Sequence, residues 1–163
     1  MEILCGARAL RYLSAVYDAA RATGQRLSVK PTDTHAAVER LEEELGALKM
    51  RAAALEEQVF ASIAAQQADK GDVVLFQEAM KPDSVRKLAD AVGKQCGGLA
   101  AVFAGPDGGK FNYALIRGDG ADISAMVKDM NKALNGRGGG RNGFAQGSVQ
   151  CGRTDIEAFF GKE

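Results

Sequence analysis

The chain has 163 residues, of which 46% are hydrophobic and 26% are charged, proportions typical of a folded globular protein rather than a disordered one. Its 21 basic and 21 acidic side chains give a formal net charge of zero, which excludes a strongly basic nucleic-acid-binding protein on totals but leaves room for a local basic patch. No apolar run reaches the length of a membrane span, and charged residues interrupt the N-terminal stretch where a signal peptide would have its apolar core. We therefore expect a cytoplasmic protein with no membrane partner.

Metal-binding and catalytic side chains are scarce. The chain has three widely spaced cysteines, Cys5, Cys96 and Cys151, and a single histidine, His35. A structural zinc site needs about four cysteine or histidine ligands, usually in close pairs, so we expect reduced thiols, no metal site and no cofactor in this chain. A nucleophile–histidine pair would depend on His35 alone, whose place near the start of an expected helix favours a solvent-exposed side chain. The sequence therefore predicts no catalytic residue.

Glycine divides the chain into two parts. Residues 1–70 contain three of the 20 glycines and residues 71–163 contain the other 17. Because each glycine costs about 1 kcal/mol in a helix interior relative to alanine, residues 1–70 are expected to form a helical arm and residues 71–163 a turn-rich globular domain. Within the arm, residues 7–22 have one apolar face and are expected to form a helix that ends near Gly24.

A second helix is expected over residues 33–68, because its apolar residues follow an unbroken heptad pattern. The members of this seam are Val38, Leu41, Leu45, Leu48, Ala52, Leu55 and Val59. A helix of this length, about 54 Å at 1.5 Å per residue, needs a packing partner for its seam. We expect the seam to pack on the 7–22 helix as an antiparallel helical hairpin. Contact of the helical arm with a second copy of the chain, which would give a homodimer, stays open.

The second part alternates short apolar runs with amphipathic stretches. The expected strands are 73–77, 99–104, 111–117 and 144–150, and the expected helices are 84–95, 123–134 and 154–160. A turn at residues 106–109 joins the second and third strands as a hairpin. The order β-α-β-β-α-β-α predicts a small mixed-sheet α/β domain, so the fold class is α/β with a helical hairpin and its long heptad helix placed first.

The clearest candidate for a binding site is the segment 136–147, GRGGGRNGFAQG, in which six of twelve residues are glycine. A glycine-rich loop lets the backbone approach a ligand closely, and successive exposed N–H groups form a nest for anions such as phosphate. The surrounding residues 130–154 contain no Asp or Glu, and the segment fits neither the Walker pattern nor the dinucleotide fingerprint. The alternative is a flexible surface connection. The candidate nucleic-acid-binding residues are Lys132, Arg137, Gly138, Gly139, Gly140, Arg141, Asn142, Gln146, Gly147 and Arg153.

This segment resembles the glycine-rich motif of the DHH-associated domain, in the form found at the C-terminus of alanyl-tRNA synthetases. In that family a GGxGGGR segment is followed after a few residues by Ala-Gln-Gly, as in residues 137–141 and 145–147 here. The resemblance extends over residues 71–163 and includes the preceding heptad helix. Ser148 stands where many members continue with glycine, and Asn142 stands where proline is frequent.

Residues 3–10, ILCGARAL, resemble the segment that closes the editing domain in alanyl-tRNA editing proteins, and they are more similar to the long free-standing editing proteins than to the synthetase. The editing site of that family uses a zinc held by an HxxxH pair and a later Cys and His, which a chain with one histidine cannot supply. The ATP-dependent core of the synthetase has no counterpart either. We therefore expect this chain to be a C-terminal piece of a longer protein whose editing domain holds the zinc.

The resemblance implies a noncatalytic tRNA-binding and assembly module that binds the outer corner of alanine tRNA and helps present mischarged tRNA to an editing site outside this chain. Backbone amides of the glycine segment, Arg137 and Arg141 would contact phosphates, and an exposed apolar or aromatic side chain would stack on a base. One alternative is a dimerisation module in which nucleic-acid binding is incidental. Another is the accessory substrate-binding domain of a DHH-type phosphoesterase, although the catalytic Asp and His clusters of those enzymes are absent. A free-standing hydrolase is the least favoured reading.

Overall fold

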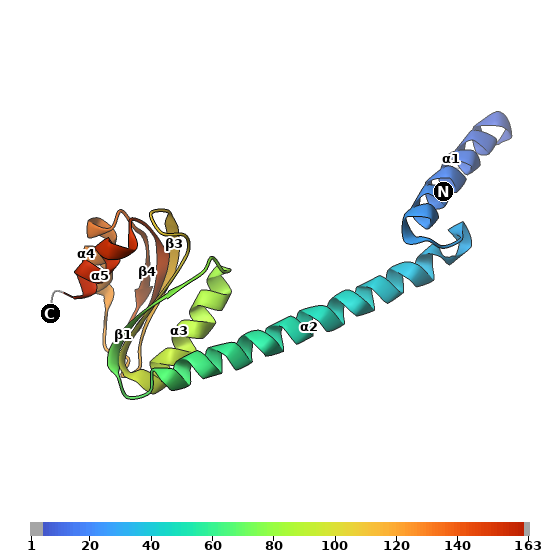
Figure 1. Ribbon diagram of the computed structural model, residues 1–163. Coiled ribbons are helices and arrows are strands. Elements are labelled where there is room, and N and C mark those ends of the chain that lie inside the picture. Colours follow the sequence, from blue (N-terminus) through green and yellow to red (C-terminus); the bar gives the residue numbers. More distant parts are fainter. Residues whose placement is uncertain (1–4, 162–163) are drawn as a thin grey trace. The chain divides into compact units, whose positions relative to one another are not determined.

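The computed structural model describes residues 5–161 and divides into two compact units, Met1–Leu55 and Glu56–Glu163 (Figure 1). The division falls within the long helix α2, Thr34–Gln66, rather than at residue 71, because Phe60 and Ala64 are buried in the core of the second unit. Residues 3 and 4, which begin the stretch resembling editing proteins, lie outside the described residues. Within the described residues, no helix is both long enough and apolar enough to cross a membrane.

The first helix, α1, spans Gly6–Leu27 and does not stop at Gly24 as predicted. Gly24 is buried, and a Cβ atom there would lie 2.7 Å from the Val29 carbonyl oxygen. The helix ends instead at Leu27 and is capped by Ser28, which adopts a left-handed conformation with φ of 57°. Gly24 therefore permits a tight return of the chain into the short 3₁₀ turn Pro31–Asp33.

The apolar faces of both helices of the first unit are exposed. The α1 residues Leu10, Leu13, Val16 and Tyr17 and the seam residues Val38, Leu41, Leu45, Leu48 and Leu55 have between 42% and 67% of their surface exposed. The prediction of a helical N-terminal part is confirmed, but the expected packing of the seam on α1 is not present. The seam is a free apolar stripe in the single chain.

The second unit is a mixed α/β domain, as predicted. Its elements after α2 are β1 Gly71–Gln77, α3 Pro82–Cys96, β2 Gly97–Ala104, β3 Lys110–Arg117, α4 Ser124–Ala133, β4 Arg137–Arg141, β5 Phe144–Gln150 and α5 Arg153–Phe160. The strands form one sheet in the order β1-β2-β3-β5-β4. Only β1 and β2 pair in parallel; the other three pairings are antiparallel. All seven predicted elements of this part are present, and β4 is an additional strand.

The sheet separates two apolar cores. On one face, α4 and α5 bury side chains such as Tyr113, Met130 and Ile156. On the other face, α3 and the last turns of α2 bury Val85, Leu88 and Val102. The α3 core takes residues from β1, β2 and β3, but among the described residues it takes none from β5 or β4. The sheet therefore has one covered face and one face that is open over its last two strands.

Candidate nucleic-acid interface

The glycine-rich segment, residues 136–147, is a β-hairpin and not a flexible loop. Residues 137–141 form β4 at the edge of the sheet, paired antiparallel with β5 from Arg137 opposite Ser148 to Arg141 opposite Phe144. In an antiparallel pair the backbone groups point alternately toward the partner strand and away from it. Successive N–H groups therefore do not converge, and the predicted phosphate nest is not formed over these residues. What β4 can offer a ligand is therefore its side chains and the face of the sheet on which they lie.

Alternation along β4 places Arg137, Gly139 and Arg141 on one face of the sheet and Gly138 and Gly140 on the other. A Cβ atom at Gly138 would lie 2.5 Å from the Tyr113 hydroxyl, and one at Gly140 would overlap the Phe144 carbonyl oxygen. At Gly139 a Cβ atom would meet nothing within 4 Å. Close packing of the strand thus accounts for two of these three glycines, whereas the fold does not require Gly139.

Strand β4 is held by a polar network on its packed face. The Tyr113 hydroxyl donates to Asn131 Oδ1 over 3.0 Å, and Asn131 Nδ2 donates to the Gly138 carbonyl oxygen over 3.2 Å. Burial raises the pKa of Tyr113 above its ordinary value, an effect that the hydrogen bond to Asn131 partly opposes. The phenol therefore stays neutral and keeps its proton for this bond. The network joins β4 to α4 and leaves the opposite face of the strand free.

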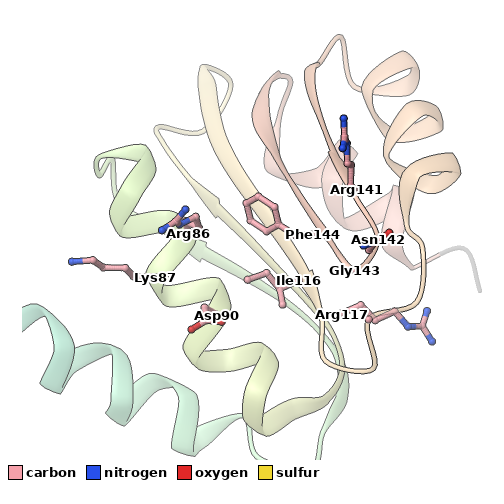
Figure 2. Close-up of a pocket in the computed structure, with 10 residues that line it drawn as sticks. Arg86, Lys87, Asp90, Ile116, Arg117, Arg141, Asn142, Gly143 and Phe144 are labelled. Atoms are coloured by element: carbon pink, nitrogen blue, oxygen red, sulfur yellow. The ribbon is translucent and has the colours of Figure 1, made fainter.

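The open face lies between α3 and β4. Four residues pair in one row across β2, β3, β5 and β4 on this face, namely Val102, Ala114, Gln146 and Gly139. The first two are buried and the last two are exposed. Where α3 stops covering the sheet, a hollow of about 570 Å³ is lined by Arg86, Lys87, Ile116, Arg141 and Phe144, among others (Figure 2). A second hollow of about 250 Å³ on this face includes Asn112, Arg137, Gln146 and Ser148 in its lining. Together the two hollows give this face a concave surface with basic residues on both sides.

The charges on this face are not neutralised internally. The ion pairs found among residues 5–161 include none of Arg86, Lys87, Arg137 or Arg141. The one acidic residue in the lining of the larger hollow, Asp90, pairs with Lys94 at 2.6 Å. The free charge on the open face is therefore positive.

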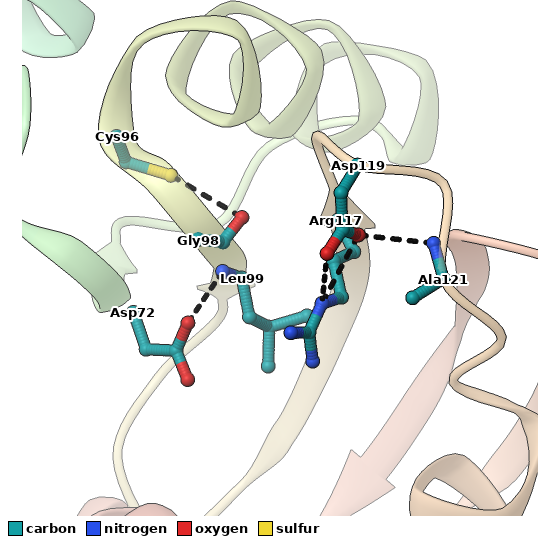
Figure 3. A network of polar contacts seen from close by, with 7 residues as sticks. All are labelled: Asp72, Cys96, Gly98, Leu99, Arg117, Asp119 and Ala121. Carbon is teal, nitrogen blue, oxygen red and sulfur yellow. Dashed lines mark hydrogen bonds and ion pairs between the residues drawn. The ribbon is translucent and has the colours of Figure 1, made fainter.

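Arg117 also lines the larger hollow, but its charge is already paired. Its Nε atom donates to both Asp119 carboxylate oxygens over 3.1 Å, and the Ala121 N–H donates to Asp119 Oδ1 over 2.9 Å (Figure 3). The backbone hydrogen bond from Ala121, followed by the contact with Arg117, holds the pKa of Asp119 below its ordinary value. We therefore do not count Arg117 among the cations available to a ligand.

The structure brings together only some of the predicted site residues. Arg137, Gly139, Arg141 and Gln146 share the open face, whereas Gly138, Gly140 and Gly147 face the α4 side. Asn142 lies in the β4–β5 turn with φ of 54°, a conformation that proline cannot adopt.

Two predicted cations lie elsewhere. Lys132 is on α4, which covers the other face of the sheet. The Arg153 guanidinium lies 4.3 Å from the centre of the Phe76 ring on β1, at the opposite edge of the sheet, and its Nε atom pairs with Glu157 at 2.8 Å. Of the four candidate cations, Arg137 and Arg141 therefore remain on the open face, and Lys132 and Arg153 lie away from it.

Sequence reasoning missed Arg86, Lys87 and Phe144. The first two flank the buried face of α3, and Phe144 was assigned to a strand without a role. These three residues line one hollow because α3 covers only part of the sheet, and no local sequence pattern indicates which strands a helix covers.

The remaining chemistry-bearing side chains do not form a second site on this surface. The three cysteines are free: Cys5 is exposed, Cys96 is buried and Cys151 is half-buried. Burial, followed by the nearby Asp155, raises the pKa of the Cys151 thiol. In the part of the chain that the structure describes, no three His, Cys, Asp or Glu side chains come together as a metal site would require.

Residues 61–159 match the model of the DHHA1 domain, the DHH-associated domain to which the sequence motifs pointed. The chain belongs to this family. The match begins within α2 and ends in α5, so the DHHA1 domain includes the whole sheet and the β4–β5 hairpin. The family resemblance seen in the glycine-rich segment is thereby confirmed.

Curated relatives extend the similarity beyond the DHHA1 domain. Alanine–tRNA ligases of Burkholderia pseudomallei (strain 668) and Burkholderia mallei (strain ATCC 23344) are 29% and 28% identical to the chain in an alignment 159 residues long, which covers 90% of this chain and 18% of each ligase. The chain thus spans less than a fifth of the length of these relatives. A solved structure titled as the C-Ala domain from Aquifex aeolicus alanyl-tRNA synthetase is also similar, with 24% identity and a TM-score of 0.45 over 56% of this chain and 87% of that one.

Proposed function

We propose that this chain is a noncatalytic tRNA-binding module of an alanine–tRNA ligase or an alanyl-tRNA editing protein. The observation that carries this proposal is the exposed face of β4, where Arg137 and Arg141 flank Gly139, a glycine that the fold does not require. Neither arginine is in an ion pair among residues 5–161. Two cations on an open strand suit the phosphates of a nucleic-acid backbone, and similarity to alanine–tRNA ligases over 90% of the chain indicates tRNA as the nucleic acid.

In the finer form of the proposal, the partner is alanine tRNA and the contact is its outer corner. Phosphate contacts set position and orientation without reading sequence, so selection of the amino acid and of the tRNA would depend on other parts of a longer protein. The module would help present mischarged tRNA to an editing site outside this chain, where the zinc of the editing domain would lie. This chain itself would bind no cofactor and catalyse no reaction.

The phosphate-binding role can be tested by replacing both Arg137 and Arg141 with alanine and measuring tRNA binding by gel shift at several salt concentrations. We expect weaker binding and a salt slope reduced by about 1.5 to 2, because each lost phosphate contact removes about 0.7 to 0.9. A fold check by circular dichroism should show no change, since both side chains are exposed.

A matched control removes two positive charges from the other face of the sheet. Lys128 and Lys132 are exposed on α4, so replacing both with alanine gives the same change in net charge. The proposal expects tRNA binding by this variant to stay close to wild type. If both double variants lose affinity equally, or if neither does, the β4 face is not the tRNA-binding surface.

A second candidate function is homodimerisation, and the exposed seam favours it. A contiguous apolar stripe on a soluble protein marks an interaction surface, and the heptad spacing of the seam is that of helix pairing. We propose that Val38, Leu41, Leu45, Leu48, Ala52, Leu55 and Val59 pack on the same residues of a second copy. All the seam residues except Ala52 are exposed large apolar side chains in the single chain, and this exposure supports the pairing.

Sedimentation at several protein concentrations tests the dimer. Leu45→Asp or Leu48→Asp should convert it to a monomer, whereas Ala47→Asp, which places the same charge outside the seam, should leave it intact. A wild-type chain that is monomeric at every concentration would contradict this second proposal without touching the first.

A further inference from the structure

Phe144 is an aromatic side chain that the fold does not use. It begins β5, is half-buried and belongs to neither apolar core among the described residues. Its register partners are Ile116 on β3 and Arg141 on β4, so its ring lies on the open face of the sheet. A phenyl ring that packs in neither core and remains partly exposed to solvent is suited to contact with a ligand.

The ring stands between two basic walls. Figure 2 shows Phe144 in the space between α3, which carries Arg86 and Lys87, and β4, which carries Arg141. Neither arginine is in an ion pair in the described part of the chain, and the carboxylate of Asp90 is taken by Lys94. The groove therefore combines an accessible aromatic face with free cations on both sides of it.

The dimensions of the groove suit a small planar group. Its volume of about 570 Å³ lies within the range of about 300 to 1,000 Å³ found for small-molecule sites. Its floor is apolar at Ile116 and Phe144, and its rim is polar. Phosphate contact alone would explain the cations but would leave the aromatic floor without a purpose.

The chemistry that matches both features is a nucleotide whose base is not stacked in a helix. Proteins that bind single-stranded segments pair an aromatic platform for the base with a positively charged groove that follows the backbone. RNA offers such bases in its loops, bulges and ends, whereas a continuous duplex keeps its base faces covered.

We propose that the groove between α3 and the β4–β5 hairpin receives one unpaired RNA nucleotide, with its base stacked on Phe144 and the phosphates on either side of it contacted by Arg86 and Arg141. This proposal rests on the tRNA-binding function proposed above. It makes α3 part of the interface and gives Phe144 the stacking role.

Stacking can be observed directly because the chain contains no tryptophan. The substitution Phe144→Trp places a single indole in the groove, and Phe159→Trp places one on α5, at a half-buried position against the core of the other face. We expect a tRNA transcript to quench the fluorescence of Phe144→Trp and to leave that of Phe159→Trp unchanged. A fully paired RNA duplex should not quench either variant.

Affinity gives a second, independent readout. Phe144→Ala should weaken tRNA binding by about 5- to 150-fold, the range for losing one base–aromatic stack, and Phe144→Tyr, which keeps the ring, should bind as the wild type does. Phe144→Leu keeps an apolar side chain for the floor and removes the ring, so it should also bind weakly while circular dichroism shows an intact fold.

Two results would overturn the proposal in distinguishable ways. If Phe144→Leu binds tRNA as tightly as the wild type and Phe144→Trp shows no quenching by bound tRNA, no base stacks in this groove, while the arginine result can still uphold tRNA binding. If the wild-type chain binds no tRNA, both proposals fall together.

Discussion

Strands β2 and β4 belong to one sheet but meet different surroundings. Helices cover β2 on both faces, and its residues 99–104 are all buried, whereas all five residues of β4 are exposed and a helix packs against only one of its faces. In the covered half of the sheet, packing decides which residue can stand at each position. In the open half, packing constrains one face of β4, and the other face is free to carry charge. This division suggests where the chain can change without loss of fold and where it cannot.

The largest expected effect lies in the covered half. Val102→Asp would bury a carboxylate under α3 with no partner, and it should lower the free energy of unfolding by about 3 kcal/mol or more. Gln146→Asp is the matched control, because Gln146 belongs to the same register row but is exposed; its effect should stay within about 0.5 kcal/mol. Urea unfolding followed by circular dichroism measures both. Equal losses would show that the open half is as tightly packed as the covered half.

The next effect separates the two faces of β4. Gly140→Ala would drive a methyl group into the Phe144 carbonyl, so we expect a loss of about 1 to 3 kcal/mol and faster amide hydrogen exchange along the strand. Gly139→Ala adds the same methyl group where nothing lies within 4 Å, and it should leave both quantities nearly unchanged. A destabilising effect of Gly139→Ala would mean that the open face is occupied by the protein itself.

The Tyr113 network should contribute about 1 kcal/mol, which Tyr113→Phe would remove. The pKa of Tyr113 is raised in the folded state, so above pH 10 the unfolded chain loses the phenol proton before the folded chain does. The free energy of unfolding therefore falls as the pH rises through the pKa of the folded state. Below pH 10 the contribution is fully present. Urea unfolding at pH 8 and at pH 10.5 should show a smaller fall for Tyr113→Phe than for the wild type. The same fall in both proteins would place the titration in other groups.

The smallest expected change in stability comes from Gly139→Val, which should stay within about 0.5 kcal/mol because its side chain would point into open space. If the open face binds tRNA, however, the branched side chain would stand between Arg137 and Arg141 and keep the backbone of the ligand away. We expect weaker tRNA binding with little change in the salt slope, because no charge is removed. Unchanged affinity would place the contact on the arginine side chains alone.

The strands of the covered half of the sheet and strand β5 of the open half were predictable from sequence, whereas strand β4 was not. Residues 99–104 and 111–117 were predicted as strands because burial selects apolar residues at these positions. Strand β4 has three consecutive glycines at its centre and therefore no alternation of apolar and polar side chains. Hydrophobic periodicity could not predict a strand there. Its strand character comes from pairing with β5, which is a tertiary effect.

The candidate site shows the same limit. Arg137 and Arg141 were found because they flank an unusual local sequence, whereas Arg86, Lys87 and Phe144 come from segments with ordinary amphipathic patterns. Arg153 and Lys132 were grouped with the arginines through closeness in sequence. The sheet order then separated Arg153 from them, because α5 begins beside β1 and β4 lies at the other edge.

The outer side of β4 has a consequence for solubility. An edge strand offers unpaired backbone donors and acceptors to any other strand, and three successive glycines offer no side chain to prevent such pairing. Arg137 and Arg141 stand at the two ends of this edge, so two chains meeting edge to edge would bring four like charges together. We therefore expect the residues proposed to hold tRNA also to reduce aggregation of the free protein. Light scattering should show Arg137→Ala/Arg141→Ala to be more prone to self-association than Lys128→Ala/Lys132→Ala.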